Sequence, residues 1–216
     1  MELTQKFHQN SISDIAFIEK KAASQLFGLS IEIPTVKAVS QGNAGRCWIV
    51  AGLNLLHILT IDKMDFVEAT KEEFHFSSAY VCFWDKMEKA NCFLEKMIET
   101  RAEPYDKREA HSWLQYAVTD SGFWSYFTAL INKYGPVPSE IMSETVQSEN
   151  TEEMNNRMNY YIRKASADIR NVHINGESID DIYSIKEHAM NHRKSSHAWI
   201  LSSGEYFGLD IKTPLK

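Results

Sequence analysis

The sequence predicts a mostly helical fold, and three observations support this prediction. Turn signals are few, since the 216 residues include only 9 Gly and 5 Pro. Several long segments carry apolar side chains at intervals of three or four residues, which is the period of a helix with one buried face. The segment from Cys47 to Leu59 is apolar almost all round, which is typical of a helix buried on most of its faces.

The part of the chain before Cys47 is predicted to hold one helix and one extended segment. Residues 11–27 open with a serine that is a candidate cap, and their apolar side chains keep helical spacing up to Gly28. Residues 33–36, Ile-Pro-Thr-Val, follow as an extended segment. The next helix is expected to begin at or near Cys47.

The part of the chain after Cys47 is predicted to be helical with short connections. The Cys47 helix ends before Asp62, and residues 65–73 are polar. Residues 77–100 carry aromatic and aliphatic side chains as one long helix or a packed pair of helices would, and Pro104 follows them. Further helices are predicted at residues 111–118, 124–134, 154–170 and 178–183, with a surface loop at 106–108 and turns at Gly135-Pro136 and Asn175-Gly176.

The most informative stretch places Gln41 six residues before Cys47. The small residues Asn43, Ala44 and Gly45 lie between them and predict a turn, which puts Cys47 in the first turn of its helix. Unpaired N–H groups and the positive end of the helix dipole favour a thiolate there. The turn also brings the Gln41 amide and the Cys47 backbone N–H towards one point, as donors to an oxyanion would be.

The motif Gln-x5-Cys-Trp resembles the papain-like cysteine peptidases. Residues 41–48, Gln-Gly-Asn-Ala-Gly-Arg-Cys-Trp, most resemble the bleomycin hydrolase and aminopeptidase C family, whose pattern is Asn-Gln-Lys-x-Ser-Gly-Arg-Cys-Trp. Further segments resemble that family in the same order. They are residues 76–80 (its Leu-Ser-Gln-Ser-Tyr), 83–91 (Phe-Trp-Asp-Lys-x-Glu-Lys-Ala-Asn), 120–124 (Asp-Gly-Gly-Gln-Trp) and 133–138 (Lys-Tyr-Gly-Val-Val-Pro).

The resemblance implies an α+β, papain-like fold, of which this chain holds mostly the helical half that carries the cysteine, with the sheet half largely missing. It implies peptide-bond hydrolysis from the N-terminal end of a peptide substrate, through a thioester on Cys47 with Gln41 as oxyanion donor. Gly122 and Trp48 are expected to line the substrate groove, while Ser121 replaces a family glycine. The resemblance implies no metal and no cofactor, and family members form homohexamers.

The general base is the least specific part of the resemblance. Residues 196–201, Ser-His-Ala-Trp-Ile-Leu, look faintly like the family's histidine strand. His197 follows Cys47 by 150 residues, within the papain-type separation of about 130–150. This makes His197 the candidate base, with a partly exposed tail histidine as the alternative. No asparagine follows it.

The resemblance predicts two regions, residues 1–185 as the nucleophile-bearing region and 186–216 as a divergent tail. A truncated or frameshifted gene product would end in this way, and an internal deletion that retained His197 is the other interpretation. The chain alone is therefore expected to be weakly active or inactive, and to aggregate or self-associate through exposed apolar surface.

Composition excludes several classes of function. A net charge of −6 gives no basic footprint for nucleic acid. The N-terminus lacks a secretory signal and no apolar run is long enough to span a bilayer, so a cytoplasmic location is expected. Three cysteines argue against a disulfide framework, and Cys82 and Cys92 are expected to be small buried hydrophobes.

Four further residues have predicted structural roles. Trp84 and Trp124 are expected in the core, His57 is expected to be packed, and Arg46 is expected to pair with an acidic residue and fix the turn.

The alternative function for the chain is a non-catalytic helical interaction protein that retains the nucleophile segment as a relic.

Overall fold

The structure is a computed structural model that describes residues 39–63 and 73–201, with the side chains of residues 62 and 192–201 excepted. The helix predicted at 11–27 and the extended segment at 33–36 lie outside the described residues, as does most of the polar segment at 65–73. The chain divides into two units, Met1–Thr35 and Val36–Lys216. The second unit holds all of the described residues.

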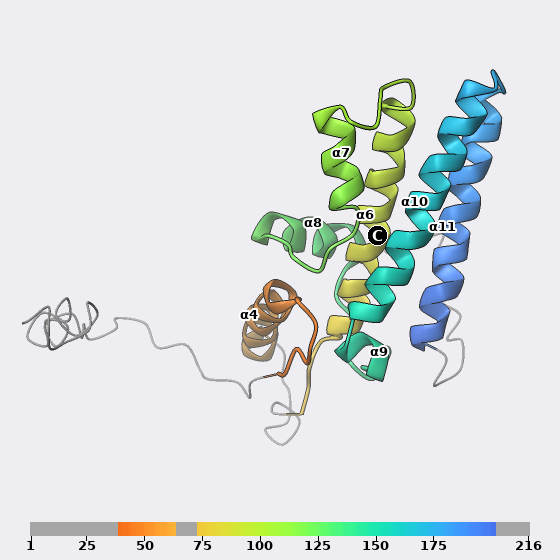
Figure 1. The fold of residues 1–216 in the computed structure, drawn as a ribbon. Helices are drawn as coiled ribbons and strands as arrows, with labels where there is room; N and C mark the ends of the chain where they lie inside the picture. Colours follow the sequence, from red (N-terminus) through yellow and green to blue (C-terminus); the bar gives the residue numbers. More distant parts are fainter. Residues whose placement is uncertain (1–38, 64–72, 202–216) are drawn as a thin grey trace, which may run out of the picture. The chain divides into compact units, whose positions relative to one another are not determined.

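The described residues are mainly helical, which confirms the first prediction (Figure 1). Their β pairing consists of one antiparallel bridge between Phe76 and Pro138. None of the described helices is long and apolar enough to cross a membrane. The helices are α4 (Cys47–Lys63), α6 (Ser78–Glu99), α7 (Arg108–Gln115), α8 (Trp124–Tyr134), α9 (Val146–Glu149), α10 (Glu152–Ile174) and α11 (Ile179–Leu201).

Helix α4 begins at Cys47, as predicted, and continues to Lys63, slightly past the predicted end. Gly52 lets it pack closely on α8, because a Cβ there would lie 2.5 Å from the Phe127 ring. As expected, α4 is buried or half-buried on most of its faces. Its exposed residues recur every fourth position and form one stripe: Cys47, Ala51, Leu55, Leu59 and Lys63.

Helix α6 is one long helix rather than a packed pair. The Ser77 side chain caps its start by accepting a hydrogen bond from the Tyr80 N–H at 3.0 Å. Helices α4, α7, α8, α10 and α11 all pack against α6, which therefore lies at the centre of the fold.

Two groups of buried side chains flank α6. The first lies between α4, the N-terminal half of α6 and α8, and includes Ile49, Val81 and Phe127. The second lies between the C-terminal half of α6, α10 and α11, and includes Phe93 and Ile162. The chain passes from the second group to the first between Val118, which follows α7, and Phe127 of α8.

Helix boundaries agree with the predictions best where a local stop is present. Helix α8 spans Trp124–Tyr134 as predicted, because Gly135 adopts φ 69° and ends it. Helix α7 begins at Arg108, so the expected loop at 106–108 is one residue shorter. Helix α11 replaces the short helix predicted at 178–183, and it also holds residues 196–201, where the resemblance pointed to a strand.

Candidate functional site

Cys47 is the first residue of α4 and is exposed to solvent. The helix begins there because the carbonyl of Arg46 accepts hydrogen bonds from the N–H groups of Ile49 (2.9 Å) and Val50 (3.1 Å). The N–H groups of Cys47 and Trp48 lie in the first turn, where no helical carbonyl is four residues behind them, and neither donates a hydrogen bond within the described part of the chain. An accessible thiol therefore lies at the positive end of a 17-residue helix.

The turn before Cys47 is held by contacts with Glu149 at one end and with Glu144 at the other. Gly42 adopts φ 63°, and a Cβ there would lie 2.6 Å from the Glu149 carbonyl oxygen. The same carbonyl accepts a hydrogen bond from the Asn43 N–H at 2.6 Å. Arg46, whose side chain is 1% exposed, pairs with Glu144 at 2.9 Å, which confirms the predicted partner for this arginine.

Gln41 lies at the start of this turn with a half-buried side chain. Its backbone carbonyl accepts a long hydrogen bond from Arg46 Nη2, at 3.5 Å, which closes the turn across five residues. The structure therefore places Gln41 and Cys47 at the two ends of one anchored loop. The role of the Gln41 amide as an oxyanion donor stays a prediction.

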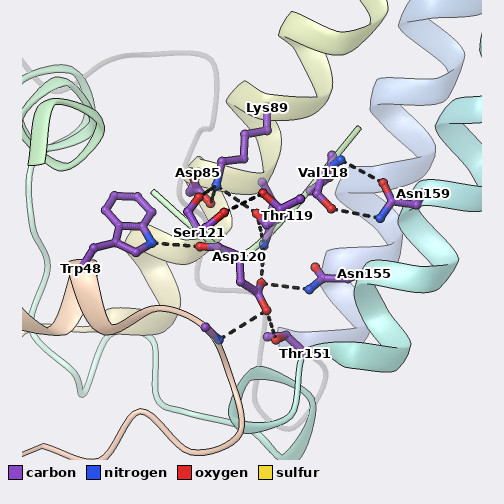
Figure 2. Close-up of polar contacts among 12 residues, drawn as sticks. Trp48, Asp85, Lys89, Val118, Thr119, Asp120, Ser121, Thr151, Asn155 and Asn159 are labelled. Carbon is purple, nitrogen blue, oxygen red and sulfur yellow. Dashed lines mark hydrogen bonds and ion pairs between the residues drawn. The ribbon is translucent and has the colours of Figure 1, made fainter. Parts of the chain in front are cut away.

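Trp48 and Gly122 lie against each other. A Cβ atom on Gly122 would come within 2.6 Å of Cζ2 of the Trp48 indole, so only glycine fits at this position. The indole Nε1 donates a hydrogen bond to the backbone carbonyl of Asp120 at 2.9 Å (Figure 2). The two residues expected to line the groove are thus neighbours in space, 74 positions apart in the chain.

The carboxylate of Asp120 accepts hydrogen bonds from four donors. Oδ1 accepts from Lys86 Nζ (2.5 Å) and Asn155 Nδ2 (2.9 Å), and Oδ2 accepts from Thr151 Oγ1 (2.7 Å) and, at 3.4 Å, from the Gly45 N–H. Partial burial alone would raise the pKa of Asp120, but the Lys86 ammonium and these hydrogen bonds hold that pKa well below its usual range. The carboxylate therefore stays charged.

Two lysines of α6 hold the segment that follows Val118. Lys86, whose side chain is 0% exposed, also donates to the Thr119 carbonyl at 2.8 Å. Lys89 donates to the carbonyls of Thr119 (2.9 Å) and Ser121 (2.7 Å), and its Nζ lies 5.5 Å from the Trp48 ring centroid. Asp85, at 2.8 Å from Lys89, balances that second charge.

Helix α10 holds the same segment from the other side (Figure 2). Asn159 accepts from the Val118 N–H and donates to the Val118 carbonyl, both at 2.9 Å. Thr151 occupies the N-cap position of α10 without a capping bond from its side chain, and its hydroxyl donates to Asp120.

A general base for Cys47 would have to be a histidine that contacts its thiol. No hydrogen bond or ion pair joins Cys47 to a histidine in the described region. His57 is buried, as predicted, and its ring lies 5.3 Å from that of His75. The side chain of His197 lies outside the described residues, so its role as base stays a prediction. No group of three or more His, Cys, Asp and Glu residues within the described ranges could hold a metal ion.

Two predictions about burial are wrong. Cys92, expected to be buried, is exposed. Cys82 is buried as predicted, and burial raises its pKa to about 11 even though Lys86 lies nearby. Cys92 precedes two fully buried residues, Phe93 and Leu94, and the 100° step of a helix turns it to the outer face. Trp84 packs on Tyr134 at 3.9 Å between ring centroids, whereas Trp124 is 57% exposed.

Asp120 is the residue that the sequence analysis missed. It lies in the motif Asp-Ser-Gly-Phe-Trp, and an aspartate before Ser-Gly is typical of a plain surface turn. Lys86 could have indicated this residue. It lies on the apolar, buried face of α6, and a buried ammonium group needs an acidic partner.

Comparisons with known proteins agree with these motifs. The profile of the Peptidase C1-like family matches residues 2–201, which extends past residue 185, where the divergent tail was predicted to begin. Aminopeptidase G from Lactobacillus delbrueckii subsp. lactis is 36% identical over 144 residues, which are 66% of this chain and 32% of that protein. Bleomycin hydrolase from Homo sapiens is 32% identical over 145 residues, 66% of this chain and 31% of that protein. The chain spans about a third of the length of these relatives.

A solved structure shares the fold. The crystal structure of PepW from Lactobacillus rhamnosis matches with a TM-score of 0.77 and 30% identity, over 92% of this chain and 44% of that one. The resemblance to aminopeptidase C and bleomycin hydrolase is thereby confirmed, while the division at residue 185 stays a prediction. From the matched profile, the relatives and the shared fold, we conclude that the chain belongs to the Peptidase C1-like family.

Proposed function

We propose that this chain supplies the nucleophile-bearing side of a cysteine aminopeptidase, with Cys47 as the nucleophile. The position of Cys47 carries the proposal, since the thiol is exposed and begins a long helix. The helix end favours the thiolate, which is the form that attacks a carbonyl. The anchored turn from Gln41 to Arg46 keeps the thiol at that end.

In the proposed reaction, the Cys47 thiolate attacks the carbonyl carbon of the substrate's peptide bond. A C–S bond forms, and the carbonyl electron pair moves to the oxygen. That oxyanion accepts hydrogen bonds from the Gln41 side-chain amide and from the Cys47 N–H. The side-chain amide of Gln41 has two N–H donors, so one can bind the oxyanion while the other binds an acceptor in the loop.

A histidine is needed to complete the cycle, and His197 is the candidate. Its imidazolium protonates the amine as the C–N bond breaks, which leaves a thioester on Cys47. The neutral imidazole then takes a proton from water as the water oxygen attacks the thioester carbonyl carbon. The C–S bond breaks, the acid is released, and the Cys47 thiolate and the imidazolium are restored. The relatives named aminopeptidase support cleavage at the N-terminal end of a peptide.

The surface around Cys47 supports its place at a cleft. Trp48 and Gly122 form one rim, and Ser121 is exposed beside them where the family pattern has a glycine. The apolar stripe of α4 continues from Cys47 through Leu55 and Leu59, which are 39% and 49% exposed. In this proposal the stripe faces the sheet half of a papain-like fold, which is the other side of the cleft.

The test is turnover of aminoacyl fluorogenic amides by the purified chain. Wild type is expected to release fluorophore slowly, Cys47→Ser to release none, and the matched control Cys92→Ser to equal wild type. Gln41→Glu keeps the shape but removes the donors, and is expected to lower kcat by about 10²–10³-fold. Turnover by Cys47→Ser equal to that of wild type would contradict the proposal.

A non-catalytic interaction protein remains the second candidate, because one observation favours it. Phe123, Trp124 and Tyr126 expose large aromatic surfaces at the start of α8, with Phe123 70% exposed. Aromatic side chains dominate many protein interfaces. Turnover that depends on Cys47 would reject this candidate.

A further inference from the structure

We propose that Asp120 is a positioning residue for the Cys47 thiol, because it holds the residues on both sides of that cysteine. This inference rests on the proposed role of Cys47 as the nucleophile. The Asp120 carboxylate accepts from the Gly45 N–H, two residues before Cys47, and its backbone carbonyl accepts from Trp48 Nε1, one residue after it. One residue thus clamps both ends of the segment that presents the sulfur (Figure 2).

The clamp depends on close packing as well as on hydrogen bonds. A Cβ on Gly45 would lie 2.9 Å from the Asp120 Cβ, so the nucleophile turn lies directly against this side chain. The Trp48 indole is held on its other side by Gly122 and lies under the Lys89 ammonium. Movement of Asp120 therefore shifts both the turn and the indole.

Asp120 is itself fixed by two helices. Lys86 of α6 and Asn155 of α10 hold Oδ1, while Thr151, at the start of α10, holds Oδ2. Lys86 is fully buried, so its charge needs this carboxylate. Through Asp120, the position of the Cys47 thiol therefore depends on α6, the central helix of the fold.

The test compares alkylation of Cys47 and Cys92 by iodoacetamide in the full chain, with each site read by peptide mapping. Both thiols are exposed, so Cys92 is an internal reference in the same molecule. Asp120→Asn keeps the shape of the side chain and removes its charge. The matched control is Glu95→Gln, which removes a carboxylate of α6 that pairs with Lys186 of α11 instead.

We expect the Cys47-to-Cys92 rate ratio to fall about tenfold in Asp120→Asn and to stay within about twofold of wild type in Glu95→Gln. The pH midpoint of Cys47 alkylation is expected to rise, because the thiolate loses its place at the helix end. Simple removal of a nearby negative charge would move that midpoint down instead. A lower midpoint, or an unchanged ratio in a variant with the wild-type circular dichroism spectrum, would overturn the proposal.

A second variant covers the case in which Asp120→Asn does not fold. Trp48→Phe keeps an aromatic ring at this position and removes the Nε1 donor to the Asp120 carbonyl, together with part of the indole that faces Gly122, so the ratio is expected to fall in the same direction. An unchanged ratio in folded Trp48→Phe would overturn the clamp. Failure of the proposed function looks different: Cys47 would react no faster than Cys92 in wild type, which rejects the nucleophile and the clamp together.

Discussion

Gly122 lies against the indole of Trp48, and a Cβ atom at position 122 would come within 2.6 Å of the indole Cζ2. The indole cannot retreat freely, since its Nε1 is bound to the Asp120 carbonyl at 2.9 Å. The rim of the candidate site is therefore a tightly packed contact between two segments that are distant in the sequence.

Gly122→Ala is predicted to displace the Trp48 ring and to lower the free energy of unfolding by about 1–3 kcal/mol, as overpacking does. Urea unfolding followed by tryptophan fluorescence measures both effects. Ser121→Ala is the neighbouring control, expected to change stability by less than about 0.5 kcal/mol because Ser121 is exposed. Equal effects of the two substitutions would contradict the close contact.

Glu144→Gln is predicted to lower the free energy of unfolding by about 1–3 kcal/mol, since it leaves the buried Arg46 charge without its partner. Nε and Nη1 of Arg46 have no hydrogen-bond partner among the described residues, so little is available to compensate. Glu153→Gln breaks an exposed pair with Arg157 and is expected to cost less than about 0.5 kcal/mol. Chemical denaturation of both variants gives the comparison, and a smaller loss for Glu144→Gln than for Glu153→Gln would refute this role.

Acid stability is predicted to depend on Asp120. Its pKa is depressed in the folded chain, so its contribution is fully present above the unfolded value of about 3.9 and is lost as pH falls below it. The free energy of unfolding of wild type should therefore fall more steeply between about pH 5 and pH 3 than that of Asp120→Asn. Urea unfolding at several pH values measures the slopes, with Glu153→Gln as the control. Parallel curves for wild type and Asp120→Asn would contradict the depressed pKa.

The apolar stripe of α4 predicts self-association of the purified chain, because Leu55 and Leu59 are exposed in line with Ala51. Leu55→Lys combined with Leu59→Lys is expected to increase the monomer fraction in sedimentation velocity and to leave the helical circular dichroism signal intact. The matched control is a pair of lysines at Tyr160 and Tyr161 of α10, which are also exposed. A sedimentation profile unchanged by the α4 substitutions would show that the stripe drives no association.

Local signals in the sequence predicted much of the fold. The start of α4 at Cys47 follows from the small-residue turn before it, and the end of α8 follows from Gly135. These two boundaries could be predicted because the deciding interactions lie within a few residues. For α6 the apolar spacing left one long helix or a packed pair open, and the structure has the single helix.

Other features depended on contacts between distant segments. Helix α11 continues past Tyr183 because Ala189 and Met190 pack on the second core group, which no local pattern reveals. Cys92 was misplaced because the prediction rested on the usual burial of cysteine, whereas its position in the helix relative to Phe93 and Leu94 puts it on the outer face. Asp120 was missed because its partners come from α6, α10 and the nucleophile turn.

The most direct test of the account is the labelling of the three thiols by an epoxysuccinyl peptide at pH 7, read by peptide mapping. Cys47 is predicted to react well ahead of Cys92, which is also exposed, and Cys82 is predicted to stay unlabelled in the folded chain because it is buried with a pKa of about 11. Labelling of Cys47 at the rate of Cys92 would contradict the claim that the start of α4 is a nucleophile site.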